Sequence, residues 1–243
     1  MVYRVMMRST FTLALLLTAG LGLGAESLPQ WLIPLREAVY EQQLNAQEIR
    51  PLYLEAKTQT QTQLTGSALD LALSRCEYFM GRALLYEKQS SEAAVHYHEG
   101  LRLSEKALTA EPSAEAWLLR AENLSQLCSI GPWTFTVSNG LDVEKFAKNA
   151  LAINSRNAAA QYIVAARWVF APAPFHNHKK GISMMMEIPN NGDMDKDDRF
   201  NVHLAIGYAY IQQRKFDDAR PWLLRALEVY PTNKYAAELL AKR

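Results

Sequence analysis

Residues 203–231, HLAIGYAYIQQRKFDDARPWLLRALEVYP, determine how the rest of the chain is interpreted. Apolar side chains recur at helical spacing on both sides of the polar segment QQRKFDD, which is typical of two amphipathic helices joined by a turn. Small residues at Gly207, Ala219 and Ala226 let the two helices approach closely. Pro231 ends the second helix because proline cannot continue it. The stretch therefore predicts a helical hairpin.

The same spacing occurs further upstream in the chain. Gly81 and Ala93 are separated by twelve residues, as are the corresponding glycine and alanine of the 203–231 hairpin. Ala107 and Pro112 repeat the alanine–proline spacing that ends that hairpin, but seven residues later. Seven residues are about two helical turns, so the second helix of this copy is predicted to be two turns longer with the same face inward.

Two weaker copies lie between these hairpins. In the first, helices over 114–127 and 143–154 are predicted to flank a long loop, CSIGPWTFTVSNGLD (128–142). Such hairpins bury their apolar faces only by stacking on one another. The sequence therefore predicts an all-α fold with no sheet. Its predicted parts are an N-terminal helical segment (26–73), helix pairs at about 74–112, 114–155, 158–190 and 200–233, and a capping helix (234–243).

The hairpin pattern resembles the tetratricopeptide repeat. Ile206-Gly207, Tyr210, Ala219, Leu223 and Pro231 stand at the repeat's characteristic intervals, and only its leading tryptophan is missing. The resemblance covers the chain after about residue 67 and implies a superhelical array. It also implies that one face of each first helix lines an inner groove.

One subfamily is suggested by the long second helix and by the proline-containing segment ARWVFAPAPF (166–175). These features are similar to the T component of periplasmic TRAP-type transporters, although the Gly-Gly pair usual in that loop is absent. The resemblance implies a protein partner, namely a solute-binding protein that docks on the array, together with a small hydrophobic ligand.

The N-terminus has the pattern of a secretory signal peptide. Arg4 and Arg8 precede the apolar segment Phe11–Leu23, and small residues follow it. We expect residues 1–25 to be cleaved and the protein to be exported, as to a periplasm. No cysteine lies near the cleavage region, so we expect no lipid anchor. An uncleaved N-terminal anchor is the alternative.

The composition limits the classes of function. The 243 residues are 49% hydrophobic and 21% charged, with a net charge of +1, which is typical of a folded protein and gives no indication of nucleic-acid binding. No nucleophile elbow, phosphate loop or zinc-protease motif is present. We therefore predict no enzymatic activity and no cofactor. The sequence does not indicate an oligomeric state.

The tetratricopeptide pattern implies which residues face the inner groove. They are Arg75, Tyr78, Arg82, Leu85 and Tyr86 in the first pair, Glu115, Leu118, Glu122, Ser125 and Gln126 in the second, Ala159, Tyr162, Ala166, Val169 and Phe170 in the third, and Asn201, Leu204, Tyr208, Ile211 and Gln212 in the last. Tyrosine and arginine dominate interface hot spots. The predicted partner-binding residues are therefore Arg75, Tyr78, Arg82, Tyr86, Tyr162, Phe170 and Tyr208.

The two arginines of this set suit a carboxylate, either of a partner's C-terminus or of a small acid. Glu115 and Glu122 stand next to Arg75 and Arg82 in the pattern and are available to pair with them. The alternative for the tyrosines is packing against the next repeat or the N-terminal helices.

Other candidate sites are weaker. His96 and His98 point to different sides of a helix, whereas His176 and His178 lie in a predicted loop but lack an evident third metal ligand. The acidic segment 193–198 fails the EF-hand pattern and instead fits the start of a helix. Cys76 and Cys128 fall too far apart along neighbouring helices to form a disulfide.

The sequence thus predicts an exported, non-catalytic scaffold that binds a protein partner through an aromatic and arginine-lined groove. A periplasmic carrier of a small hydrophobic ligand or of a metal is the alternative.

Overall fold

The computed structural model describes residues 28–242, so the predicted signal peptide lies outside the described residues. Within this part the chain forms only helices, which confirms the all-α prediction. The elements are η1 (Gln30–Leu32), α1 (Ile33–Glu41), α2 (Ala46–Gln63), α3 (Gly66–Tyr86), α4 (Ser90–Ala110), α5 (Ala114–Ile130), α6 (Trp133–Ile153), α7 (Ala158–Phe170), α8 (His178–Asn191), α9 (Lys196–Gln212), α10 (Phe216–Val229) and α11 (Lys234–Leu240).

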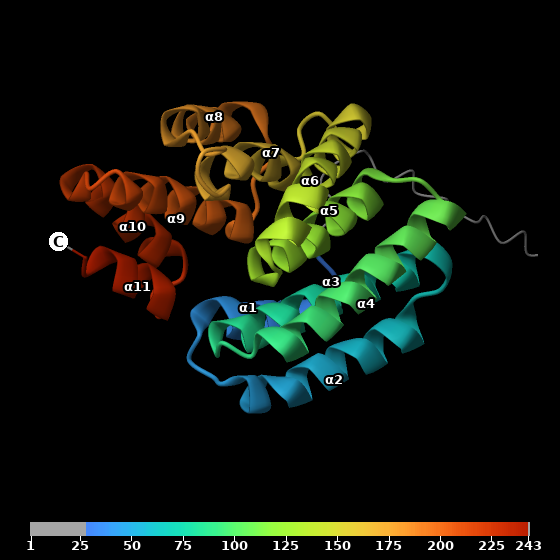
Figure 1. Ribbon diagram of the computed structural model, residues 1–243. Coiled ribbons are helices and arrows are strands. Elements are labelled where there is room, and N and C mark those ends of the chain that lie inside the picture. Colours follow the sequence, from blue (N-terminus) through green and yellow to red (C-terminus); the bar gives the residue numbers. More distant parts are fainter. Residues whose placement is uncertain (1–27, 243) are drawn as a thin grey trace, which may run out of the picture.

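The helices pack in neighbouring pairs: α3 with α4, α5 with α6, α7 with α8, and α9 with α10 (Figure 1). The second helix of each pair also contacts the first helix of the next pair, and α11 packs against α9 and α10. Helix α4 has 21 residues and α10 has 14, so α4 is longer by the seven residues that the sequence predicts.

Two boundaries differ from the sequence prediction. Helix α3 begins at Gly66 rather than at Ser74. Helix α6 begins at Trp133, so the prediction of a loop over 128–142 is wrong for most of its length. Phe135 packs against the largest apolar core, and this contact outweighs the weak helix propensity of the threonines around it.

Close helix approach depends on a glycine in two of the pairs. A Cβ on Gly81 of α3 would lie 2.6 Å from Cε1 of Tyr97 on α4. A Cβ on Gly207 of α9 would lie 2.6 Å from Cδ2 of Leu223 on α10. In both pairs the glycine faces a large buried side chain sixteen positions later, which is the same packing arrangement used twice.

The first helix contacts the last ones. Helix α1 packs against α3, and its residue Tyr40 is only 2% exposed. The Tyr40 ring stacks on Tyr230 at the end of α10, with centroids 4.9 Å apart, and meets the edge of Phe200 on α9 at 5.5 Å. The largest apolar core accordingly contains residues from both the N-terminal and the C-terminal helices.

Polar contacts reinforce this junction between α1 and the C-terminal helices. Asn233 Nδ2 donates to the carbonyl oxygen of Tyr40 at 2.6 Å, and the Thr232 hydroxyl donates to the Glu41 carbonyl at 2.8 Å. Lys196 of α9 forms an ion pair with Glu37 of α1. Helix α1 therefore joins the first and last helix pairs through these side-chain contacts.

We predict opposite effects for two glycine substitutions. Gly81→Ala should lower the free energy of unfolding by about 1–3 kcal/mol, because the new methyl group collides with the rigid ring of Tyr97. Gly140→Ala, in α6, meets no neighbouring atom and should raise the free energy by up to about 1 kcal/mol through helix propensity. Urea denaturation of both variants tests this, and a neutral Gly81→Ala would contradict it.

Candidate functional site

Four of the predicted site residues lie on one face of α3. Arg75, Tyr78, Arg82 and Tyr86 follow one another at intervals of three or four residues, which keeps them on the same side of a helix. Figure 1 shows that α3 lies behind α4. Residues of α5 bond to Arg75 and a residue of α1 bonds to Arg82, and we call this side of α3 the inner face.

Arg75 is fully engaged by acidic residues of this chain. Its guanidinium forms ion pairs with both Glu115 and Glu122 of α5, as the sequence suggested. The Arg75 side chain is 14% exposed, so this is a largely desolvated triad. Burial raises the pKa of Glu122, while the charge of Arg75 opposes that shift. Two carboxylates already occupy Arg75, which leaves little capacity to recognise a third.

Arg82 has different partners. Its Nη1 donates to the hydroxyl of Tyr40 at 2.8 Å and to that of Tyr78 at 3.4 Å, and its Nη2 donates to Tyr86. The guanidinium carbon lies 4.5 Å from the centroid of the Tyr40 ring, in cation–π geometry. We call Arg82, Tyr40, Tyr78 and Tyr86 the Arg82 cluster. Burial raises the pKa of Tyr78 to about 12, so this phenol stays protonated at neutral pH.

No carboxylate of the described residues forms an ion pair with Arg82. Two acidic residues are near enough for Arg82 to lower their pKa, namely Glu122 and Asp197. Glu122 is bonded to Arg75, and Asp197 accepts a hydrogen bond from the Tyr230 hydroxyl at 2.6 Å. Within the described chain, Arg82 is thus a largely desolvated cation whose nearest acids are committed elsewhere.

The remaining predicted residues form an aromatic extension of the inner face. Tyr162 of α7 is half-buried, and burial raises its pKa. Phe170 at the end of α7 packs against Tyr208 of α9 with ring centroids 5.0 Å apart. Phe170 is 48% exposed.

Sequence reasoning missed two residues of the inner face. Tyr40 belongs to α1, which carries no repeat signature, and it reaches Arg82 only because the ends of the array meet. Tyr235 of α11 is 38% exposed, and Tyr208 and Tyr86 both raise its pKa, although burial is the larger cause. No sequence signal distinguished either tyrosine, because each approaches the site from a non-repeat helix.

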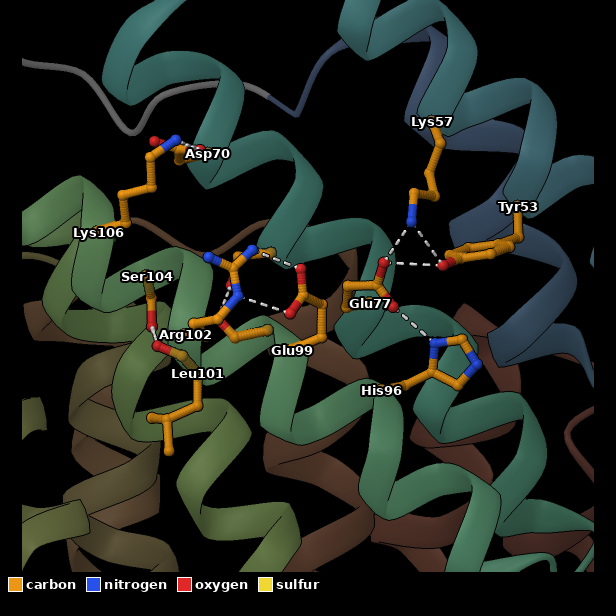
Figure 2. Close-up of polar contacts among 12 residues, drawn as sticks. Tyr53, Lys57, Asp70, Glu77, His96, Glu99, Leu101, Arg102, Ser104 and Lys106 are labelled. Carbon is orange, nitrogen blue, oxygen red and sulfur yellow. Dashed lines mark hydrogen bonds and ion pairs between the residues drawn. The ribbon is translucent and has the colours of Figure 1, made fainter.

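A second polar cluster lies between α2, α3 and α4. Figure 2 shows Tyr53, Lys57 and His96 converging on the buried carboxylate of Glu77. The distances to Glu77 are 2.7 Å from the Tyr53 hydroxyl, 2.7 Å from Lys57 Nζ and 2.6 Å from His96 Nδ1.

The pKa values of Tyr53 and Lys57 favour a structural role for these two residues. Burial raises the pKa of Tyr53 to about 12, and the hydrogen bonds to Glu77 and Tyr53 raise that of Lys57 against its burial. Acid–base catalysis near neutral pH needs a group that titrates there. Tyr53 and Lys57 instead stay protonated and act as fixed donors that tie α2 to α3.

The weaker candidates are placed as follows. His176 and His178 stack with ring centroids 4.6 Å apart, and no group of three potential metal ligands occurs within residues 28–242.

Asp195 caps α9 by accepting a hydrogen bond from the Asp198 amide, which accounts for the acidic segment. Cys76 and Cys128 are free thiols, and burial raises their pKa values to about 12 and about 11.

Two clefts lie away from the inner face. One of about 750 Å³ lies between the α9–α10 turn and the end of α11, beside Phe216 and Leu240. The other, of about 280 Å³, lies where α4 begins and α5 ends, beside His98 and Phe135. Neither contains a residue of the Arg82 cluster.

No family model matches the chain, and no curated protein sequence matches it significantly. Among the described helices, none combines the length and the apolar character that crossing a bilayer requires. The site is therefore interpreted from its own geometry.

We predict a pH-dependent contribution of Glu77 to stability. Burial raises the pKa of Glu77, but the hydrogen bonds from His96, Lys57 and Tyr53 outweigh this and hold it below its ordinary value. Stability from such a group is present above the unfolded-state pKa and is lost as pH falls through the folded-state pKa.

Glu77→Gln should therefore lower the free energy of unfolding by about 2–3 kcal/mol at pH 7, because buried donors lose a charged acceptor. The deficit should shrink below about pH 4. Glu99→Gln is the control, because the Glu99–Arg102 pair is exposed and should change stability by less than about 1 kcal/mol. Chemical denaturation at several pH values measures both, and a deficit unchanged at pH 3 would refute the assignment.

Proposed function

We propose that this chain is a tetratricopeptide-like array, exported and non-catalytic, that binds a protein partner on its inner face. Support for the array comes from the four helix pairs and from the repeated glycine contact at Gly81 and Gly207. The apolar segment Phe11–Leu23 supports export. Support for a binding role comes from the exposed aromatic side chains of Phe170 and Tyr235.

The observation that carries the binding proposal is the aromatic extension of the inner face. Phe170 and Tyr235 are 48% and 38% exposed, and Phe170 packs on the half-buried ring of Tyr208. Rigid aromatic side chains that are exposed together provide large contact areas at little cost in conformational entropy. We call Phe170, Tyr208 and Tyr235 the aromatic patch.

The resemblance to the T component of TRAP-type transporters suggests the partner. On this proposal, a solute-binding protein of the same compartment docks on the aromatic patch. The near-neutral net charge of the chain favours recognition through apolar contacts rather than through long-range attraction.

One observation favours the alternative of a small-ligand carrier. Helix α1 packs on α3 and places Tyr40 against Arg82, so a partner segment lying along α3 would have to displace α1. A small molecule needs no such displacement. On this proposal the inner face has two parts. The aromatic patch is open to a protein partner, and the Arg82 cluster is more enclosed.

We predict that partner binding depends on the aromatic patch. A photo-crosslinking residue replacing Phe170 should join the protein to a partner in extracts of the source cells. The Tyr208→Ala and Tyr235→Ala substitutions together should reduce that product at least about tenfold, as expected for hot-spot residues.

The matched control is Leu54→Ala with Val95→Ala. These side chains are 54% and 67% exposed but lie on α2 and α4, away from the patch. This variant should crosslink like the unsubstituted protein. Equal losses in both variants, or no crosslinked protein at all, would refute the proposed function.

A further inference from the structure

The hydrogen-bond arrangement around Arg82 has more donors than acceptors. Guanidinium has five N–H groups, and three of them donate to Tyr40, Tyr78 and Tyr86. Each phenol oxygen therefore accepts from Arg82, and its own O–H is left to donate elsewhere. Tyr40 also accepts from Asn201 Nδ2 at 3.2 Å, so its oxygen has two donors and its proton is left to donate elsewhere.

No acceptor among the described residues takes these phenol protons. Neither Tyr40, Tyr78 nor Tyr86 donates a hydrogen bond to another described residue. Tyr97, whose ring lies 6.4 Å from that of Tyr78, has a buried hydroxyl with no partner in this part of the protein. Unmatched donors and an unpaired cation are both costly where water is largely excluded, and an anion would relieve both.

We propose that Arg82 and the hydroxyls of Tyr40, Tyr78 and Tyr86 form a binding site for a carboxylate group. The two remaining guanidinium N–H groups and the phenol protons would supply the donors for the roughly four acceptor positions of its two oxygens. Carboxylates accept several charge-assisted hydrogen bonds at once, and arginine is the side chain that matches their geometry best.

The charge of the site favours a monoanion. Arg82 contributes one positive charge, and the second arginine of this helix face is balanced by Glu115 and Glu122. A phosphate dianion would leave a negative charge unpaired in a desolvated site, whereas a carboxylate would not. The rings of Tyr40 and Tyr78, whose centroids lie 4.5 Å and 5.8 Å from the guanidinium carbon, are suited to an apolar body attached to that carboxylate.

The site is accessible from one side. Arg82 and Tyr86 are half-buried, unlike Tyr40 and Tyr78, which are buried. Tyr86 is the last residue of α3. A ligand would therefore approach Arg82 from the side of Tyr86 at the end of this helix.

Calorimetric titration of the purified protein tests this site without any protein partner, so its outcome is separate from that of the proposed function. Hexanoate is the probe, hexanamide is its uncharged match, and inorganic phosphate is the alternative anion. We expect hexanoate to bind at least about tenfold more tightly than either, since a charge-assisted hydrogen bond is worth about 1.5–3 kcal/mol.

Two variants locate the binding. Tyr86→Phe keeps the ring and leaves the α1 contact of Arg82 intact, and it should weaken hexanoate binding about tenfold. Arg82→Gln should abolish binding. Arg102→Gln is the control, because it makes the same chemical change on the exposed face of α4. It should bind like the unsubstituted protein.

The source of the carboxylate is resolved by a further pair of probes. A hexapeptide with a free C-terminus that binds more tightly than hexanoate, and loses binding on amidation, would assign the carboxylate to a chain terminus. Tighter hexanoate binding would assign it to a free acid. Equal binding of hexanoate and hexanamide, preference for phosphate, or full binding by the folded Tyr86→Phe variant would overturn the proposal.

Discussion

The contact between the Tyr40 ring and the three groups around it is the constraint on which the architecture depends. Tyr40 stacks on Tyr230, meets the edge of Phe200 and carries the guanidinium of Arg82 over its face. These partners come from α10, α9 and α3, so one side chain of α1 links the first helix pair to the last. Burial of an aromatic ring contributes several kcal/mol, and here that energy stabilises a closed array.

Closure of the array also determines the electrostatics of the inner face. By covering α3, helix α1 removes water from Arg82 and from the phenols that surround it. Hydrogen bonds and charges interact more strongly where water is excluded. The same helix that completes the fold therefore also creates the largely desolvated surroundings of Arg82 on which the proposed carboxylate site rests. Folding and recognition share one set of contacts.

The repeated hairpins were predictable from sequence because their determinants are local. Gly81 and Gly207 each face a residue sixteen positions later, a distance that a single hairpin spans. The α1 contacts were not predictable, because Tyr40 and Tyr230 are far apart in sequence and Tyr40 belongs to a helix that carries no repeat signature. The start of helix α6 was predicted to be a loop over 128–142 for a related reason. Phe135 is held in the helix by tertiary packing rather than by local propensity.

The two arginines of α3 show why a residue pattern alone does not define a site. Arg75 and Arg82 are two helical turns apart on one face, and the sequence assigned both to carboxylate binding. Helix α5 supplies Glu115 and Glu122 to the first, whereas α1 supplies only the phenol of Tyr40 to the second. An arginine that is paired with carboxylates of the same chain contributes to the packing of the helix pairs. An arginine without such a partner is free to select a ligand. Recognition in this chain is thus decided by which helix covers each arginine.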